Sequence, residues 1–331
     1  MRNKICFSFL ICCIVLSSFI GCTNDLEVPS SNPSSNPSSN MEFAVQSESY
    51  DSIPIEYDNS IFYIENDMIY KKNSVETQLL FKNSDSNSEL CDLNVIDDKM
   101  YFFVLNSNGD FALYCLSING ENKELLLTKQ QLTQNDEYYN GSVYCENRIY
   151  IQTRFSLYCY DISTCKAGMI ENDVGIFQIV KDQLYYIDHA ERTFTVYKLD
   201  LNTRTKKIVL GEGKIQEKSK ARNLYSNFII IDDAIICYKR NPDGLFYYKN
   251  NEELLISVSE GVDELYLLEY NGDLFFVQSQ NGQNFIMQYD LSEKMLTTFA
   301  VFDDYYSDLS VSGGYLYYKN AEKNLSKVKL S

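Results

Sequence analysis

The chain has 331 residues, with 29 basic and 46 acidic side chains and a formal net charge of −17 at pH 7. Such an acidic surface repels phosphate backbones, so nucleic acid is excluded as an expected partner. The single histidine, His189, leaves one possible base for a His-paired nucleophile, and the absence of any C-x-x-C pair argues against a zinc site.

The first segment is predicted to be an export signal. Arg2 and Lys4 precede an apolar run, Ile5–Ile20, that is too short to remain as a membrane span. The run ends in Phe-Ile-Gly-Cys at residues 19–22, which resembles the lipobox of bacterial lipoproteins. By that resemblance, residues 1–22 are a lipoprotein signal peptide and Cys22 carries a lipid. The expected location is then extracytoplasmic, anchored to the cell membrane. A plain secretory signal is the alternative.

The second segment is predicted to be a disordered tether over residues 23–41. It contains the repeat PSSNPSSNPSSN at residues 29–40, which has no apolar side chain to bury. A flexible spacer of this length reaches about 25 Å root-mean-square. The folded part, residues 42–331, is therefore expected to hang from the membrane on this tether.

Seven copies of one strand pattern fill the rest of the chain. Each copy is an apolar strand, a polar turn such as Asp97-Asp98, an aromatic strand and two further strands. We anchor the copies on the residue that closes the first motif: Tyr63, Tyr101, Tyr150, Tyr185, Ile236, Phe275 and Tyr317. From the second copy on, the anchors lie on average about 43 residues apart, which predicts an all-β propeller of seven blades. Six blades result if the first copy merges with the last.

The two ends of the chain are predicted to close the ring together. The last copy stops after its third strand, whereas residues 42–57 carry strand sequence ahead of the first copy. A terminal strand that completes the opposite end's blade removes open sheet edges. We therefore expect the segment near Phe43–Ile55 to pair with the final blade.

The repeats LNVIDDKMYFF, SVSGGYLYYKN and TVYKLDLNTRTKKIVL resemble those of a Gram-positive, largely clostridial β-propeller family of unknown function. That family is distantly similar to the YWTD propellers of lipoprotein receptors, and the resemblance covers residues 59–330. The chain departs from it by lacking tryptophan. Apolar residues hold the family's Trp position: Met100, Ile149, Leu184, Ile235, Leu274 and Leu316. The resemblance brings no catalytic residues with it.

The candidate ligand-binding residues lie in loops that meet at one face of a propeller. Three tyrosines, Tyr139, Tyr225 and Tyr306, stand eleven residues before their anchors, so we expect them at one structural position at the mouth of the central funnel. A tyrosine ring with its hydroxyl suits sugar or peptide recognition. The alternative is that these rings pack between blades. The polar neighbours expected from the other turns are Asn108, Arg154, His189, Arg192, Arg240 and Asp243.

These observations favour a non-catalytic surface lipoprotein that binds or scaffolds a glycan, peptide or protein partner as a monomer. No cofactor and no metal are expected. The alternative is a surface carbohydrate-active enzyme, a hydrolase or lyase with carboxylates in the central funnel. Six cysteines follow Cys22, and we expect most of them to be reduced. Cys115 and Cys159 occupy the same repeat position, one blade apart.

Overall fold

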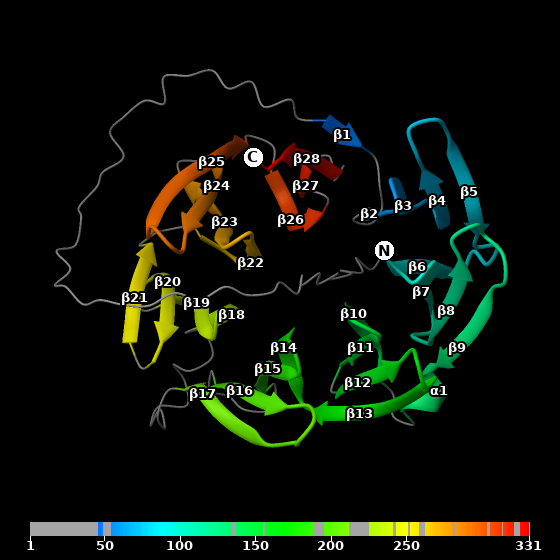
Figure 1. The fold of residues 1–331 in the computed structure, drawn as a ribbon, viewed down its shortest axis with the longest axis horizontal. Coiled ribbons are helices and arrows are strands. Elements are labelled where there is room, and N and C mark those ends of the chain that lie inside the picture. The colour runs from blue at the N-terminus through cyan, green and yellow to red at the C-terminus, as the bar shows by residue number, and fades with distance from the viewer. Residues whose placement is uncertain are drawn as a thin grey trace.

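The computed structural model describes residues 46–48, 54–133, 137–154, 156–188, 195–211, 225–240, 243–250, 252–257, 262–280, 283–302, 305–312, 314–320 and 325–330. These residues form seven antiparallel sheets of four strands each, arranged in a ring (Figure 1). The expected seven-bladed all-β propeller is confirmed, and the six-bladed alternative is wrong.

Each of the first six blades uses four consecutive strands, with the first nearest the ring's centre (Figure 1). Blade 1 contains β2 (Ile55–Tyr57), β3 (Ser60–Glu65), β4 (Met68–Lys72) and β5 (Thr77–Lys82). Blade 2 contains β6 (Ser88–Ile96), β7 (Lys99–Asn106), β8 (Phe111–Ser117) and β9 (Glu124–Thr128). Blade 3 contains β10 (Tyr139–Cys145), β11 (Arg148–Thr153), β12 (Ser156–Asp161) and β13 (Lys166–Asn172). Blade 4 contains β14 (Val174–Val180), β15 (Gln183–Asp188), β16 (Thr195–Asp200) and β17 (Lys206–Gly211). Blade 5 contains β18 (Tyr225–Ile231), β19 (Ala234–Arg240), β20 (Asp243–Lys249) and β21 (Glu252–Ser257). Blade 6 contains β22 (Val262–Tyr270), β23 (Asp273–Gln280), β24 (Gln283–Asp290) and β25 (Met295–Phe302).

Blade 7 joins the two ends of the chain. Its first three strands are β26 (Tyr305–Ser312), β27 (Tyr315–Asn320) and β28 (Leu325–Lys329). Its outer strand is β1 (Gln46–Glu48), which pairs antiparallel with β28 and lies beside it in Figure 1. The expected closure is confirmed. Among the described residues of this segment, Gln46–Glu48 supplies the closing strand, and Ile55–Tyr57 forms the inner strand of blade 1.

Tight turns connect the first and second strands of each blade. In blade 2, Asp97 and Asp98 both adopt left-handed backbone conformations, with φ of 48° and 60°. Asp232 and Asp233 do the same in blade 5, with φ of 48° and 62°. Two consecutive positive φ values define the hairpin turn whose twist matches the flanking strands, and aspartate tolerates them better than most residues.

The position of the turn corrects the anchor of the first copy. Tyr101 is the third residue after the turn Asp97-Asp98, and the equivalent residue after the positive-φ pair Asp58-Asn59 is Phe62. The expected anchor Tyr63 was wrong by one residue. Three large side chains in a row, Ile61 to Tyr63, hide the alternation in the sequence.

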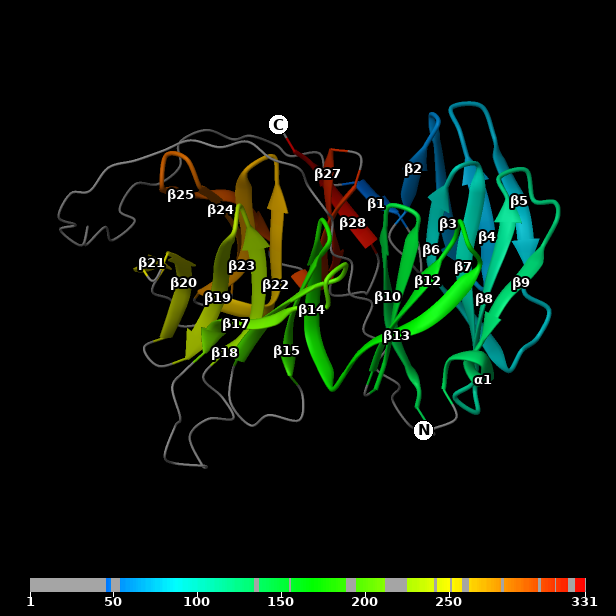
Figure 2. The ribbon, with the colours of Figure 1, turned by 60° about the horizontal axis from the view of Figure 1, so that its bottom comes forward.

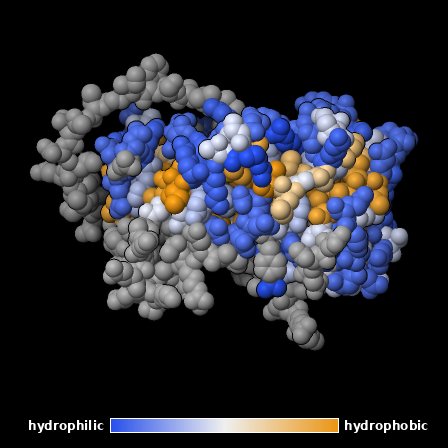
Figure 3. Space-filling view, turned by 90° about the horizontal axis from the view of Figure 1, so that it is seen from below, coloured by the Kyte–Doolittle hydropathy of each residue, from blue (hydrophilic) through white to orange (hydrophobic). Residues whose placement is uncertain are grey.

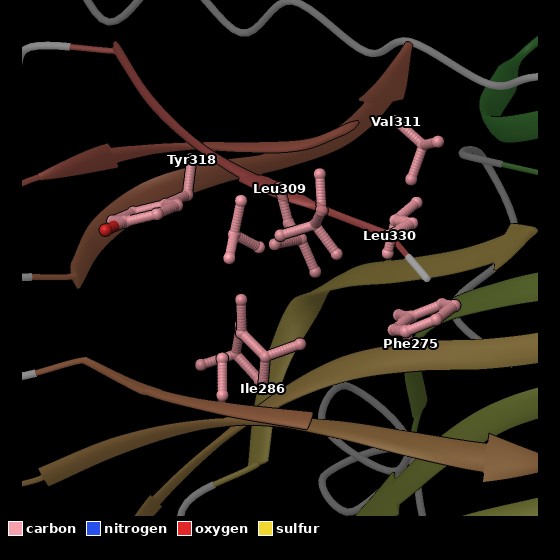
Figure 4. Close-up of a cluster of buried hydrophobic side chains, with 10 residues drawn as sticks. Phe275, Ile286, Leu309, Val311, Tyr318 and Leu330 are labelled. Carbon is pink, nitrogen blue, oxygen red and sulfur yellow. The ribbon is translucent and has the colours of Figure 1, made fainter. Parts of the chain in front are cut away.

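Alternate residues of each second strand face opposite neighbouring blades. Tyr101 and Phe103 lie in a buried cluster with residues of blade 3, whereas Met100 and Phe102 lie in a cluster with residues of blade 1. This follows from the period of two in a β-strand. The core is therefore divided into clusters between neighbouring blades. In the cluster between blades 6 and 7, Tyr318, Leu309 and other side chains of blade 7 lie opposite Ile286 and Phe275 (Figure 4).

The outer strands share an irregularity. In blades 1 to 6, the register shifts between the third and fourth strands, at Leu113/Tyr114 in blade 2 and at the same place in the others. Bulges of this kind disrupt an edge that could otherwise pair with another chain. Exposed apolar residues stand at these bulges in five blades: Leu79, Leu125, Met169, Ile208 and Leu255. Figure 3 shows apolar surface along the middle of the ring's side, between polar rims.

Candidate functional site

We call the loop face the end of the ring that carries two kinds of connection: the loops that lead into each first strand, and the turns between second and third strands. A short helix, α1 (Lys129–Leu132), lies there between β9 and β10, at one edge of the ring (Figure 2). The backbone N–H of Thr128 donates to Gln131 Oε1 at 2.7 Å, which caps the first turn of the helix. The Lys129 ammonium lies 3.7 Å from the Asp110 carboxylate, so α1 is held against the turn between β7 and β8.

A buried carboxylate fixes the segment that follows α1. Glu137 is only 2% exposed, and it accepts hydrogen bonds from the hydroxyls of Thr153 and Thr133. Burying a carboxylate is costly unless hydrogen bonds compensate it. Because its two partners come from the end of β11 and from just after α1, Glu137 ties these two segments together.

Tyr139 points into the interface between blades 2 and 3. Its ring centroid lies 4.7 Å from that of Phe103 and 5.4 Å from that of Phe111, and its hydroxyl donates to the Asp92 carboxylate. Asp92 also accepts from the backbone N–H of Ser142 at 2.9 Å. Burial, together with the Asp92 charge, raises the pKa of Tyr139 well above its usual value, so the phenol stays neutral. This geometry corresponds to the alternative in which the ring packs between blades.

Tyr138, the preceding residue, points outward. It is 49% exposed and is the one aromatic among the exposed large hydrophobic side chains of the described residues. The Arg154 guanidinium carbon lies 5.6 Å from its ring centroid, within the range of a cation–π contact. The backbone N–H of Arg154 donates to the Tyr138 carbonyl at 3.0 Å, which joins the two loops directly. The structure therefore presents an aromatic ring and a cation side by side at the loop face.

Asn108 lies in the neighbouring turn between β7 and β8 and is exposed. Its side-chain amide donates to Asp110 at 3.0 Å, and its oxygen accepts from the Asp110 backbone N–H at 2.9 Å. Through Asp110 and Lys129, this turn supports α1. The structure thus brings Asn108, Tyr139 and Arg154 of the predicted set to one sector of the loop face.

For some of the other predicted residues the structure describes the backbone alone, and the rest lie outside the described residues. Tyr225 begins β18 and pairs with Lys239, three residues after the anchor, as Tyr139 pairs with Thr153. In blade 7 the equivalent residue is Tyr305, which pairs with Asn320, so Tyr306 lies one residue off this position. Arg240 and Asp243 are cross-strand partners at the ends of β19 and β20. His189, Arg192 and Cys22 lie outside the described residues.

Two thiols at one repeat position, Cys115 and Cys159, are poorly suited to nucleophilic chemistry. The six cysteines after Cys22 all lie in the described residues, and none of them forms a disulfide there. Cys115 and Cys159 pair with the anchors Tyr101 and Tyr150, which confirms their shared repeat position. Burial raises the pKa of Cys115, and it raises the pKa of Cys159 to about 11. Since the thiolate is the reactive form, both side chains act as small apolar residues near neutral pH.

Within the described ranges, no group of three or more His, Cys, Asp and Glu side chains is arranged to hold a metal ion. In the same residues, which begin at residue 46, no helix is long and apolar enough to cross a membrane.

Sequence reasoning missed Tyr138 and Glu137. The sequence signal for Tyr138 was the alternation of side chains along a strand. Adjacent residues at the start of β10 face opposite ways, so an inward Tyr139 implies an outward Tyr138. The tandem Tyr138-Tyr139 marked the position, but the spacing to the anchor singled out the inner ring. Glu137 had no sequence signal, since its burial depends on contacts with Thr133 and Thr153 that form only in the folded loop.

Solved structures share the fold. A puromycin-hydrolyzing peptidase of Mycobacterium tuberculosis aligns with a TM-score of 0.59 at 9% identity, over 83% of this chain and 50% of that chain. Dipeptidyl peptidase 4 of Porphyromonas gingivalis aligns with a TM-score of 0.54 at 8% identity, over 80% of this chain and 50% of that one. The N-terminal domain of Nup159 aligns with a TM-score of 0.51 at 11% identity, over 82% and 86%. This chain thus spans half the length of each peptidase. No protein-family profile and no curated protein matches it. At these identities the comparisons show a propeller fold shared by peptidases and other proteins.

Proposed function

We propose that the protein is a non-catalytic surface lipoprotein, anchored through a lipid on Cys22, that binds a glycan, peptide or protein partner with its loop face. The lipobox-like residues 19–22 and the spacer of residues 23–41 support the anchoring. The resemblance of its repeats to a Gram-positive propeller family of unknown function is compatible with this role.

The observation that carries the binding proposal is the Tyr138–Arg154 pair. Exposed aromatic and arginine side chains dominate the energetics of many interfaces. Here the pair stands on a fixed base, because Glu137 lies buried directly before Tyr138 and the Arg154 backbone bonds to the Tyr138 carbonyl. A preorganised pair loses little side-chain freedom when it binds.

The acids of this sector do not favour the enzyme alternative. Glu137 is buried beneath two threonine hydroxyls, and Asp92 accepts bonds from Tyr139 and Ser142. Asp110 is paired with Lys129 and bonded to Asn108. A glycoside hydrolase needs two carboxyl groups that are free to face its substrate. The three carboxylates in this described sector already have structural partners.

The test of binding is an array of glycans, peptidoglycan fragments and peptides, followed by titration of each hit. Tyr138→Ala and Arg154→Ala should each weaken binding at least about tenfold, as expected for central interface residues. Met169→Ala, an exposed residue on the outer strand β13, is the matched control and should bind normally. Wild-type affinity in both loop-face variants places the site elsewhere, and turnover of a bound fragment supports the enzyme alternative.

The test of anchoring is independent. Cys22→Ser should release the protein from the membrane into the medium, since a lipid is the expected attachment. A Cys22→Ser protein that stays in the membrane fraction contradicts the lipoprotein proposal and leaves the binding proposal intact.

A further inference from the structure

The strand that closes the ring is held differently from the other outer strands. The outer strands of blades 1 to 6 have between five and eight residues, and each follows its partner directly in the chain. β1 has three residues, and it pairs with a strand from the opposite end of the chain. No hairpin turn therefore keeps β1 next to β28.

The sequence of β1 is short and polar. Gln46, Ser47 and Glu48 have no large apolar side chain, and they pair with Lys327, Ser326 and Leu325. The described attachment consists of three antiparallel backbone pairs, and each hydrogen bond of this kind contributes about 1 kcal/mol net. Because three such pairs contribute little free energy, β1 can separate from β28 and pair with it again.

The neighbouring seam, the interface between blades 7 and 1, is sparsely packed among the described residues. Among the described residues its buried cluster contains two side chains, Tyr63 and Tyr317, whereas the other clusters contain six to ten. Blade 7 also holds two buried hydroxyls, those of Ser310 and Ser326, that have no hydrogen-bond partner among the described residues. Buried polar groups of this kind cost stability.

We propose that β1 exchanges between two copies of this chain, so that each copy's Gln46–Glu48 completes blade 7 of the other. The acceptor edge of β28 is the same in every copy, and the exchanged strand makes the same pairs as the original one. Swapping of an identical element therefore costs little beyond association. Residues 49–54 separate β1 from β2 in the sequence, and six residues span up to about 20 Å when fully extended.

Concentration decides between the closed and exchanged forms. A strand on a short linker competes with an effective concentration in the millimolar range. The protein is then a monomer in dilute solution and exchanges its strand where copies are crowded. Since each copy carries a charge of −17, salt should favour exchange by screening the repulsion.

The test uses one cysteine on each side of the pairing. One full-length variant carries Gln46→Cys and a second carries Lys327→Cys, both with Cys165→Ser to remove the exposed native thiol. The two are mixed at about 1 mM in high salt, diluted and oxidised, and the linked peptides are identified by mass spectrometry. We expect at least about ten times more of the mixed disulfide than in a mixture kept near 1 µM.

Two further variants make the result decisive. A single chain with both Gln46→Cys and Lys327→Cys should form the disulfide within itself, which shows that the register is correct and the ring is folded. A partner with Ser292→Cys, in an exposed turn of blade 6, should give no link to Gln46→Cys. The proposal is overturned if the single chain forms its disulfide but the mixture forms none, or if Ser292→Cys links equally well.

Discussion

The interface between blades 2 and 3 and the seam between blades 7 and 1 join neighbouring blades by different means. The first contains ten buried side chains, including Phe103, Phe111 and Ile149, and is further linked by the bond from Tyr139 to Asp92. The seam contains two buried tyrosines among the described residues and is closed by the strand β1. Each fully buried large apolar side chain contributes about 1.5–3 kcal/mol, so the difference in packing is large.

This contrast shows that a ring of repeats need not be uniformly packed. Blades that follow one another in the chain meet through well-packed clusters of side chains. The last contact brings together the two ends of the chain, and among the described residues it combines a small buried cluster with the backbone pairing of β1 and β28. Four predictions break or sharpen this comparison.

The largest effect is expected from removing the closing segment. Deleting Met41–Tyr57 removes both β1 and β2, the outer strand of blade 7 and the inner strand of blade 1. Two sheet edges are then exposed, and we expect the melting temperature to fall by more than about 10 °C. Deleting residues 23–40 instead, which belong to the predicted tether, should leave the melting temperature unchanged. A Met41–Tyr57 deletion that melts like the wild type would contradict closure through these strands.

The second prediction compares the two interfaces directly. Phe103→Ala should lower the free energy of unfolding by about 4 kcal/mol, because Phe103 is fully buried in the ten-residue cluster. Tyr63→Ala, in the two-residue cluster of the seam, should cost about 2 kcal/mol, since fewer contacts are lost. Urea unfolding of both variants measures the difference. Equal losses would mean that the seam is as well packed as the other interface.

The repeat pattern was sufficient to predict the blades. Its period, its polar turn pairs and its aromatic second strands follow from the same local rules in every copy, and the missing fourth strand of the last copy pointed to the terminus that supplies it. The anchor of the first copy was misplaced because Ile61-Phe62-Tyr63 lacks a visible alternation. Local patterns also left open how much of residues 42–57 closes the ring, because both ends of that segment have strand character.

The candidate site was predicted only in part, for a physical reason. Spacing located Tyr139 and placed Arg154 and Asn108 nearby, since loop positions repeat with the blades, but it did not single out Tyr138. Which ring faces the interior depends on the register of β10 against β11, and on Asp92, whose carboxylate lies in another blade. Such long-range contacts leave no periodic signal in the sequence.

The third prediction separates these two tyrosines. Tyr139→Phe removes the hydroxyl that donates to the Asp92 carboxylate and should destabilise the protein by about 2 kcal/mol. Tyr138→Phe, next to it but exposed, should change stability by less than about 0.5 kcal/mol. Thermal or urea unfolding gives both values. A stable Tyr139→Phe protein would show that the bond to Asp92 does not hold blades 2 and 3 together.

The fourth prediction, with the smallest expected effect, concerns a carboxyl group in the interface between blades 5 and 6. Glu269 of β22 pairs with Leu274, at the position that Val95 holds in blade 2 and Val311 in blade 7. Burial raises the pKa of this carboxyl, and the charges of Asp232 and Asp273 raise it further, against the bond it accepts from the Gly272 N–H. Because the folded pKa lies above the unfolded one, the folded state binds the proton more tightly than the unfolded state. The contribution of Glu269 to the free energy of unfolding therefore falls as the pH rises from its pKa in the unfolded state through its pKa in the folded state. This contribution stays low at neutral pH.

Glu269→Gln should consequently raise the melting temperature slightly at pH 7, because the amide is neutral and its oxygen still accepts from Gly272. The gain should disappear below the unfolded pKa, where the native carboxyl is protonated in both states. The control is Glu293→Gln, an exposed residue in the turn after β24, which measures the effect of removing one acidic charge at the surface. A melting temperature that falls at pH 7 would show that the charge of Glu269 stabilises the interface between blades 5 and 6. That interface would then depend on electrostatics as well as on its eight buried side chains.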